Sequence, residues 1–183
     1  MTVKPKIIGI VAVPFASISD YLKFLDSSGF LNIDLNKVAA EILKEEFSLS
    51  NLEEEEISSH KDKIWAIYGK SYLVNKAVTD WIPWVESHAE VNPGFYNFAV
   101  SNIETIEEVK YLQSKFSDEF RLVGIITPRI ERLERFKDVT KQDTIKYNEI
   151  EERVVRTNFC NTLLMADLIV TKENDFETIK KIL

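Results

Sequence analysis

Two runs of apolar residues, many of them β-branched, constrain the fold of this chain more than any other feature. Residues 6–13 read KIIGIVAV and residues 120–127 read FRLVGIIT. A strand that is apolar on both faces is typical of a parallel sheet covered by helices on either side. Shorter runs at 30–33, 95–100 and 167–171 are predicted to be further strands of the same sheet.

Segments with helical periodicity separate these runs. Helices are predicted over Ser17–Asp26, Asp34–Phe47, Lys63–Trp84, Glu104–Phe116, Pro128–Phe136, Lys141–Arg156, Asn158–Met165 and Phe176–Leu183. Strands that alternate with helices predict a three-layer α/β fold with a parallel sheet. We expect residues 1–183 to form a single domain, with a helical insertion over residues 48–91.

Composition excludes several classes of function. The net charge of −7 argues against a nucleic-acid partner held by phosphate neutralisation. One cysteine and two histidines are too few for a disulfide framework or a zinc site rich in these residues, so no metal is expected. No apolar run reaches the roughly 20 residues that span a bilayer, and the N-terminus lacks a signal-peptide pattern. We therefore expect a soluble, cytoplasmic protein with no membrane partner.

The segment Ser48–Asp62 has no core periodicity and contains four consecutive glutamates, Glu53–Glu56. It is predicted to be a solvated linker or the start of an acidic helix. A third reading is a tail that binds a partner protein.

Four segments, residues 29–41, 107–112, 127–135 and 166–179, resemble in this order parts of the dephospho-CoA kinases and the related deoxynucleoside-monophosphate kinases. Residues 29–41, GFLNIDLNKVAAE, are similar to the stretch G-F-P-V-I-D-A-D-K-I-A-R-E of dephospho-CoA kinases. Residues 107–112, 127–135 and 166–179 resemble the segment after the third strand, the opening of the lid and the end of these kinases. The resemblance implies a P-loop nucleotide-kinase fold and covers most of the chain outside residues 48–91.

The phosphate-binding loop departs from this family. At the three glycine positions of the family loop the chain has Ala12, Phe15 and Ser17, and at the lysine position it has Ile18. Only the final hydroxyl, Ser19, matches. A side chain is strained where φ must be positive, and isoleucine cannot neutralise a phosphate. We therefore expect a degenerate loop with a different conformation.

Two further positions depart in the same direction. The monophosphate kinases carry D-G-I-R after the third strand, where this chain has Ser101–Glu104, and a glutamate facing a phosphate would repel it. In the last strand–helix loop, the family's Asn and Gly are replaced by Lys172 and Asn174.

The candidate site residues each have a functional and a structural reading. Asp34 matches an acid that the resemblance places near the attacking hydroxyl as a general base, and it is also a plausible helix cap. The remaining candidates would bind phosphate from the lid or from a helix N-terminus, or would serve as surface ion pairs and caps. They are Arg129, Arg132, Arg135 and Arg153, with Arg156 beside them, and the loop hydroxyls Ser17 and Ser19. The glutamates offered as ion-pair partners are Glu131, Glu134, Glu151 and Glu152.

The leading hypothesis is a kinase-derived fold that has lost catalysis and acts as a binding or assembly module for a protein partner, with no cofactor. The partner would bind to the acidic run Glu53–Glu56 or to the aromatic helical insertion over residues 48–91. One alternative is an active kinase that uses ATP and Mg²⁺ to phosphorylate dephospho-CoA or a (deoxy)nucleoside monophosphate, with Lys23 or Lys172 supplying the missing charge. The other is a nucleotide sensor that binds without catalysis.

Overall fold

A five-stranded sheet forms the centre of the molecule in the computed structural model, which describes residues 5–52, 54–83, 97–140, 144–156, 159–171 and 176–183. The strands are β1 (Ile7–Ala12), β2 (Phe30–Asp34), β3 (Asn97–Ser101), β4 (Phe120–Ile125) and β5 (Leu168–Val170). Their order is β2-β3-β1-β4-β5, and every pairing is parallel. Ile7 of β1 lies opposite Phe98 of β3 and Phe120 of β4, so the first strand of the chain is the central one.

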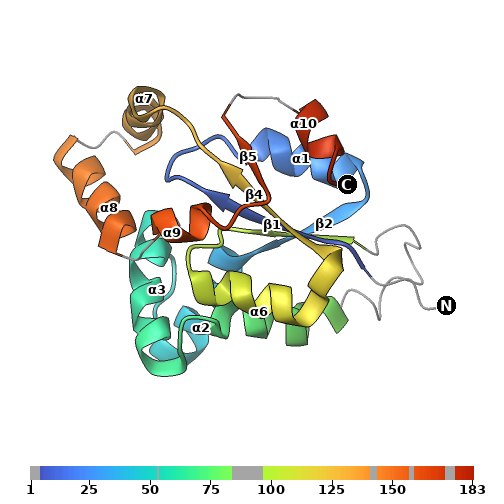
Figure 1. Cartoon of the computed structure of the whole chain (residues 1–183). Helices are drawn as coiled ribbons and strands as arrows, with labels where there is room; N and C mark the ends of the chain where they lie inside the picture. Colours follow the sequence, from blue (N-terminus) through green and yellow to red (C-terminus); the bar gives the residue numbers. More distant parts are fainter. Residues whose placement is uncertain (1–4, 53, 84–96, 141–143, 157–158, 172–175) are drawn as a thin grey trace.

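Helices cover both faces of this sheet (Figure 1). The helices are α1 (Ser19–Ser27), α2 (Leu35–Phe47), α3 (Glu54–Tyr68), α4 (Tyr72–Lys76), α6 (Ile106–Phe116), α7 (Arg129–Thr140), α8 (Thr144–Arg156), α9 (Phe159–Leu163) and α10 (Phe176–Lys180). A π-helical turn, η1 (Ala77–Trp81), follows α4, and a 3-10 turn, η2 (Ser117–Glu119), precedes β4. Helices α1 and α10 pack on one face, and α2, α3, α4, α6 and α9 pack on the other. The predicted three-layer α/β architecture is confirmed.

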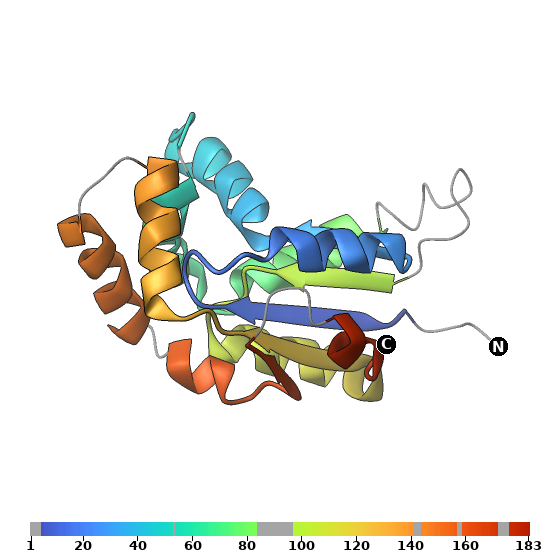
Figure 2. The ribbon, with the colours of Figure 1, turned by 90° about the horizontal axis from the view of Figure 1, so that it is seen from above.

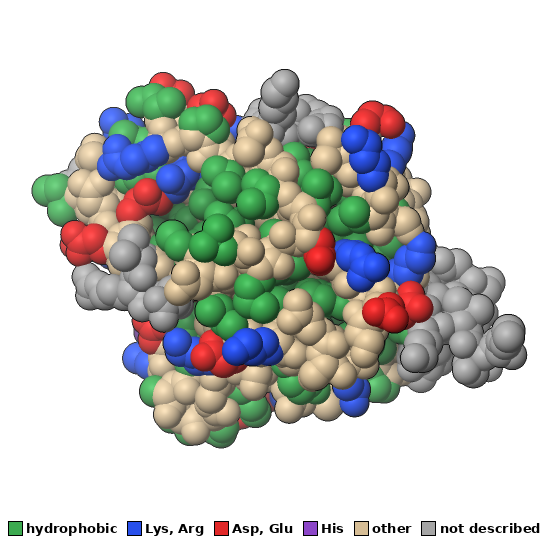
Figure 3. Space-filling view, in the orientation of Figure 1, with side chains coloured by type: hydrophobic (Ala, Val, Ile, Leu, Met, Phe, Trp, Pro, Cys, Tyr) green, Lys and Arg blue, Asp and Glu red, His purple; other side chains and the backbone are tan. Residues whose placement is uncertain are grey.

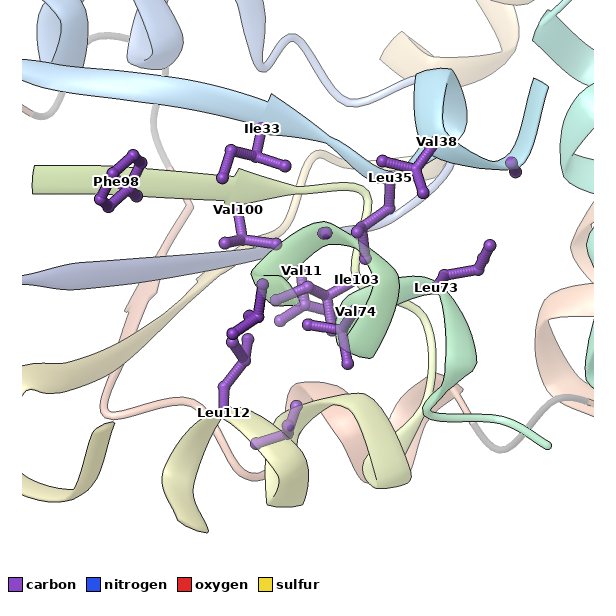
Figure 4. Close-up of a cluster of buried hydrophobic side chains, with 14 of the residues drawn as sticks. Val11, Ile33, Leu35, Val38, Leu73, Val74, Phe98, Val100, Ile103 and Leu112 are labelled. Carbon is purple, nitrogen blue, oxygen red and sulfur yellow. The ribbon is translucent and has the colours of Figure 1, made fainter. Parts of the chain in front are cut away.

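The larger of the two hydrophobic clusters lies between the sheet and the helices α2, α4 and α6 (Figure 4). Val11 and Val100 project from the sheet, and Val74 and Leu112 meet them from α4 and α6. All four side chains are fully buried. The helical segment 54–82 therefore contributes to the same core as the sheet. Its description as an insertion within one domain stays a prediction.

The structure corrects the prediction of a solvated linker over residues 48–62. Helix α3 begins at Glu54, and its inward face carries Ile57, Lys61 and Ile64. The alternative of an acidic helix start is confirmed. The single predicted helix 63–84 is divided, because α3 ends before Gly69, whose φ of +89° departs from helical geometry. Trp65 of this region is buried, and Trp84 lies outside the described residues.

Two of the predicted helix boundaries are confirmed and one is wrong. Asp34 is the N-cap of α2, since its Oδ1 accepts a hydrogen bond of 2.8 Å from the backbone N–H of Asn36. Gly29, with φ +86°, follows the end of α1 as predicted. The expectation that Ser17 or Ser19 caps α1 is wrong: the N-cap is Ile18, and no side chain among the described residues caps that end. None of the described helices is long and apolar enough to cross a membrane.

Candidate functional site

The loops that follow the strands meet at one end of the sheet, where ligands bind in parallel α/β folds. Figure 2 shows the strands pointing toward the side on which α7 and α8 lie. Three segments converge there: the loop 13–18 after β1, the loop 102–105 after β3, and the residues 126–128 after β4. The positions at which the sequence departs from the kinase pattern are therefore close together in space, apart from Lys172 and Asn174, which lie outside the described residues.

The loop after β1 places an aromatic ring against helices α7 and α8. Phe15 has φ +60°, so it adopts the left-handed conformation despite the steric cost expected for its side chain. Its ring centroid lies 5.1 Å from that of Phe136 on α7 and 5.9 Å from that of Tyr147 on α8. Both partner rings are fully buried. The N–H of Ala16 donates to the carbonyl of Val13 at 3.0 Å, so that N–H is already used within the loop.

Arg132 of α7 is held entirely by the protein's own oxygens. Its guanidinium forms a two-pronged ion pair with Glu151 of α8, in which Nη2 lies 3.2 Å from Oε2. Nε donates to the carbonyl of Thr127 at 3.0 Å, and Nη1 donates to that of Pro14 at 3.3 Å. The predicted pairing with Glu151 is correct, but the pair is not a surface one, because only 8% of Arg132 is exposed.

The other two arginines of α7 also face groups within the protein. Arg135 Nη1 donates to the carbonyl of Phe15 at 3.4 Å, and Nη2 lies 4.0 Å from Glu131. Arg129 is exposed, donates to Asn148 Oδ1 at 2.9 Å, and lies over the ring of Tyr147. The loop therefore presents two carbonyl oxygens to Arg132 and Arg135 of α7. In a phosphate-binding loop, backbone N–H groups face the ligand instead.

The loop after β3 connects Asp34 to a second residue with positive φ. Asn102 has φ +62° at the position of the family's glycine, and asparagine tolerates this conformation better than most residues. Its side-chain amide donates to Asp34 Oδ1 at 2.7 Å. One oxygen of Asp34 thus accepts from both Asn102 and Asn36. The structural role of Asp34 is confirmed, and its role as a general base stays untested.

A cluster of buried charges that the sequence did not reveal surrounds Glu104. Lys61 of α3 is fully buried, and its Nζ donates to Glu104 Oε1 at 2.8 Å and to the carbonyl of Asn102 at 3.2 Å. Arg153 of α8 donates from Nη1 to Glu104 Oε2 at 3.1 Å and pairs with Asp62 at 3.4 Å. Burial works to raise the pKa of Glu104, but the charges of Lys61 and Arg153 outweigh it and lower that pKa.

Glu108 lies beneath this cluster at the start of α6. Its Oε2 accepts from the backbone N–H groups of Glu104 and Thr105, at 2.9 and 3.0 Å, in a capping box. The side chain is fully buried, and Oε1 has no hydrogen-bond partner among the described residues. Burial is the main cause that raises the pKa of this carboxyl to about 7, against the partial opposition of Lys61.

A groove of about 480 Å³ opens between the β1 loop and the helices α7, α8 and α9. It is lined by Val13, Pro14, Arg132, Glu151, Glu152, Val154, Phe159, Cys160 and Leu163. In Figure 3, hydrophobic side chains gather over this region, with basic and acidic side chains along the α7 and α8 side. The groove is therefore mainly apolar with a charged edge.

The remaining candidates do not join these clusters. Lys23 pairs with Asp20 on the exposed side of α1, at 3.0 Å, and Ser19 is exposed at the start of the same helix. The side chain of Arg156 lies outside the described residues. Within the described part of the chain, no group of three or more His, Cys, Asp or Glu side chains has the arrangement of a metal site.

Comparisons with known proteins reveal similarity at the level of structure. No protein-family model and no curated protein sequence matches this chain. A shikimate kinase from Bacteroides thetaiotaomicron has a TM-score of 0.52 at 13% identity, covering 97% of this chain and 93% of that one. An uncharacterized protein from Eubacterium ventriosum has a TM-score of 0.53 at 16% identity, covering 98% of both chains. A dephospho-CoA kinase from Campylobacter jejuni has a TM-score of 0.46 at 17% sequence identity, and the match covers 96% of this chain and 92% of that one.

At these identities the similarity shows the fold alone. The strand order β2-β3-β1-β4-β5 and the extent of the match to the shikimate kinase agree with the fold class predicted from the sequence. The chain therefore shares its fold with this shikimate kinase: a five-stranded parallel sheet between two layers of helices.

Proposed function

We propose that this protein is a kinase-derived fold that does not transfer phosphoryl groups and instead acts as a binding or assembly module. One observation carries the proposal: Arg132, Lys61 and Arg153, at the carboxyl ends of the strands, are paired with the protein's own carboxylates Glu151 and Glu104. Phosphoryl transfer depends on cations that are directed at the phosphates. In this protein, the ion pairs of Arg132, Lys61 and Arg153 stabilise the folded chain instead.

The loop supports the same proposal. Ile18 stands where the family has its lysine, and the carbonyl oxygens of Pro14 and Phe15 face Arg132 and Arg135. A triphosphate at this position would have to displace these contacts and separate the ring of Phe15 from Phe136. That displacement opposes nucleotide binding.

Binding to a protein partner is the activity that we propose for such a fold. The sequence suggested two surfaces for a partner, the aromatic helical insertion and the acidic run. Trp65 of the insertion is buried in the core, so the insertion offers less aromatic surface to a partner. The acidic run lies partly outside the described residues.

Titration of the purified protein with ATP and Mg²⁺ tests the proposal. We expect no rise in melting temperature beyond that of a matched salt control, and no ADP formed with dephospho-CoA or a deoxynucleoside monophosphate as acceptor. Stabilisation with turnover would establish the active kinase, with ATP and Mg²⁺ as its cofactors. Stabilisation without product would establish the nucleotide sensor.

A matched pair of variants tests whether the loop residues Phe15 and Ile18 prevent nucleotide binding. The double variant Phe15→Gly/Ile18→Lys restores the family's residue types at two loop positions, and we expect it to gain an ATP-dependent rise in melting temperature. Phe15→Gly/Ile18→Gln has the same backbone freedom without the charge, and we expect no such rise. A null result with both variants would mean that the loop residues are not what prevents binding.

A further inference from the structure

Glu104 lies where three parts of the fold meet. It belongs to the loop after β3, its Oε1 faces Lys61 of α3 at 2.8 Å, and its Oε2 faces Arg153 of α8 at 3.1 Å. Each carboxylate oxygen therefore meets a cation from a different helix. The carboxylate lies between two positive charges that would otherwise repel each other.

One of these cations cannot find a counter-ion in solvent. Lys61 is fully buried, and a buried ammonium group without an anion is costly. Its Nζ also donates a hydrogen bond to the neutral carbonyl of Asn102. The Glu104 carboxylate is therefore the anion in hydrogen-bond contact with Lys61, while Glu108 lies near enough for Lys61 to lower its pKa.

The site also has an open side. The side chains of Glu104 and Arg153 are 15% and 18% exposed. Arg153 Nη1 also donates to Ser58 Oγ at 3.0 Å, and Ser58 lies within 3.5 Å of Glu104 Oε1. Around the carboxylate stand an ammonium, a guanidinium and a hydroxyl, the donor set that binds small oxyanions.

The main chain holds Glu104 in this position. The N–H of Glu104 donates to Glu108 Oε2 at 2.9 Å, and its carbonyl accepts from Thr162 Oγ1 at 3.1 Å. A shortened side chain at residue 104 would thus leave the main chain of this loop in place.

We propose that Glu104 is a built-in substitute for a bound anion: it fills an oxyanion site formed by Lys61, Arg153 and Ser58, and it holds α8 against α3 without any ligand. This inference deepens the proposed function and rests on it. In many kinases and other transferases, lids close when substrate binds. In this protein the carboxylate of Glu104 takes the place of the ligand and holds α8 against α3. Once Glu104 is removed, the chemical class that fits the site is a small oxyanion, such as a carboxylate or inorganic phosphate.

The experiment compares Glu104→Ala with the wild type in sodium chloride, sodium acetate and sodium phosphate at matched ionic strength. In chloride we expect the variant to melt roughly 5 to 10 °C below the wild type, because Lys61 has lost its anion. Acetate or phosphate is expected to restore much of this loss with saturable dependence on concentration, and to slow hydrogen exchange in α8. The wild type should not respond in this way.

Two controls define the site. Glu104→Ala/Arg153→Met lacks one of the two cations, and its response to acetate should be lost. Glu107→Ala removes an exposed carboxylate close by in sequence and should melt like the wild type in every salt. An equal response of Glu104→Ala to all three salts, or an acetate response in the wild type, would overturn the proposal.

If Glu104→Ala does not fold in chloride, refolding it from denaturant in acetate gives the same information, and failure in both salts would contradict the proposal. Glu104→Gln keeps the volume but not the charge, so we expect it to be destabilised without rescue by acetate. ATP turnover by the wild type would reject the proposed function. It would not affect the anion response, so the two failures are distinguishable.

Discussion

Phe15 combines an unfavourable backbone with favourable side-chain contacts. A left-handed conformation costs a residue such as phenylalanine roughly 1–2 kcal/mol. The ring of Phe15 packs against two buried aromatic rings, and aromatic pairs stabilise by about 0.5–1.5 kcal/mol each beyond the area that they bury. The contacts thus offset the strain. The sequence predicted the strain from the glycine position, but the contacts join residues more than 100 positions apart and no local pattern reveals them.

The burial of Lys61 could have been predicted from the spacing of its apolar neighbours. Ile57, Lys61 and Ile64 are spaced by four and three residues, so Lys61 lies on the apolar stripe of an amphipathic helix. The glutamate run before it suggested a solvated segment instead. Its partner Glu104 is 43 residues away, which sequence periodicity cannot detect.

Glu108 gives a prediction at the scale of a single residue. Its pKa is raised from 4.5 to about 7 in the folded protein, so the folded state binds this proton more tightly than the unfolded state. Stability is therefore lost as the pH rises from about 4.5 to about 7, by about 3 kcal/mol from this group. Glu108→Gln keeps an oxygen for the two backbone N–H groups and does not titrate. We expect its unfolding free energy, relative to the wild type, to increase over this pH range.

Urea denaturation at a series of pH values measures this difference. Glu107→Gln serves as the control, because Glu107 is exposed on the same helix, and its profile should run parallel to that of the wild type. Parallel profiles for Glu108→Gln as well would show that folding does not raise the pKa of the buried carboxyl.

At the scale of elements, helix α8 is held by ion pairs on two sides. Glu151 joins it to α7 through Arg132, and Arg153 joins it to Glu104 and Asp62. The sequence predicted the strands well, since β-branched apolar runs identify buried strands without knowledge of their partners. It did not predict how α8 is anchored, because that depends on which charges the topology brings together.

Arg132→Met tests the anchoring of α8 to α7. The variant removes the ion-pair partner of Glu151 and the hydrogen bonds that Arg132 donates to the carbonyls of Thr127 and Pro14. We expect a loss of roughly 2–4 kcal/mol in unfolding free energy. Arg129→Met changes an exposed arginine of the same helix and should stay within about 0.5 kcal/mol.

Chemical denaturation of both variants, and of Arg132→Met/Glu151→Met, provides the measurement. The double variant should lose less than the sum of the two single variants, since the partners are coupled. A cost for Arg132→Met no larger than that for Arg129→Met would mean that the buried pair does not stabilise the fold.

At the scale of the whole molecule, the sheet is most protected at its centre. β1 is paired on both sides, by β3 and β4, and Ile7, Ile8, Ile10 and Val11 are at most 2% exposed. β5 has three residues, and α10 has five. The periodicity of the sequence was sufficient to predict a parallel α/β sheet, but not the order of its strands, because several orders occur in that class.

Native-state hydrogen exchange should reproduce this gradient. Amides of β1 are expected to exchange only through global unfolding, and amides of α10 through local opening at much lower free energy. Exchange measured as a function of denaturant by mass spectrometry separates the two cases. Equal protection of β1 and α10 would indicate that the C-terminal helix is as firmly attached as the central strand.

The guanidinium of Arg153 lies 5.9 Å from the centre of the Trp65 ring. Indole emission depends on nearby charge and on contact with water. The fluorescence of Trp65 therefore reports on the position of α8. With Trp81 and Trp84 replaced by Phe, the colour and intensity of the remaining fluorescence would follow the opening of this helix in real time, without an attached dye.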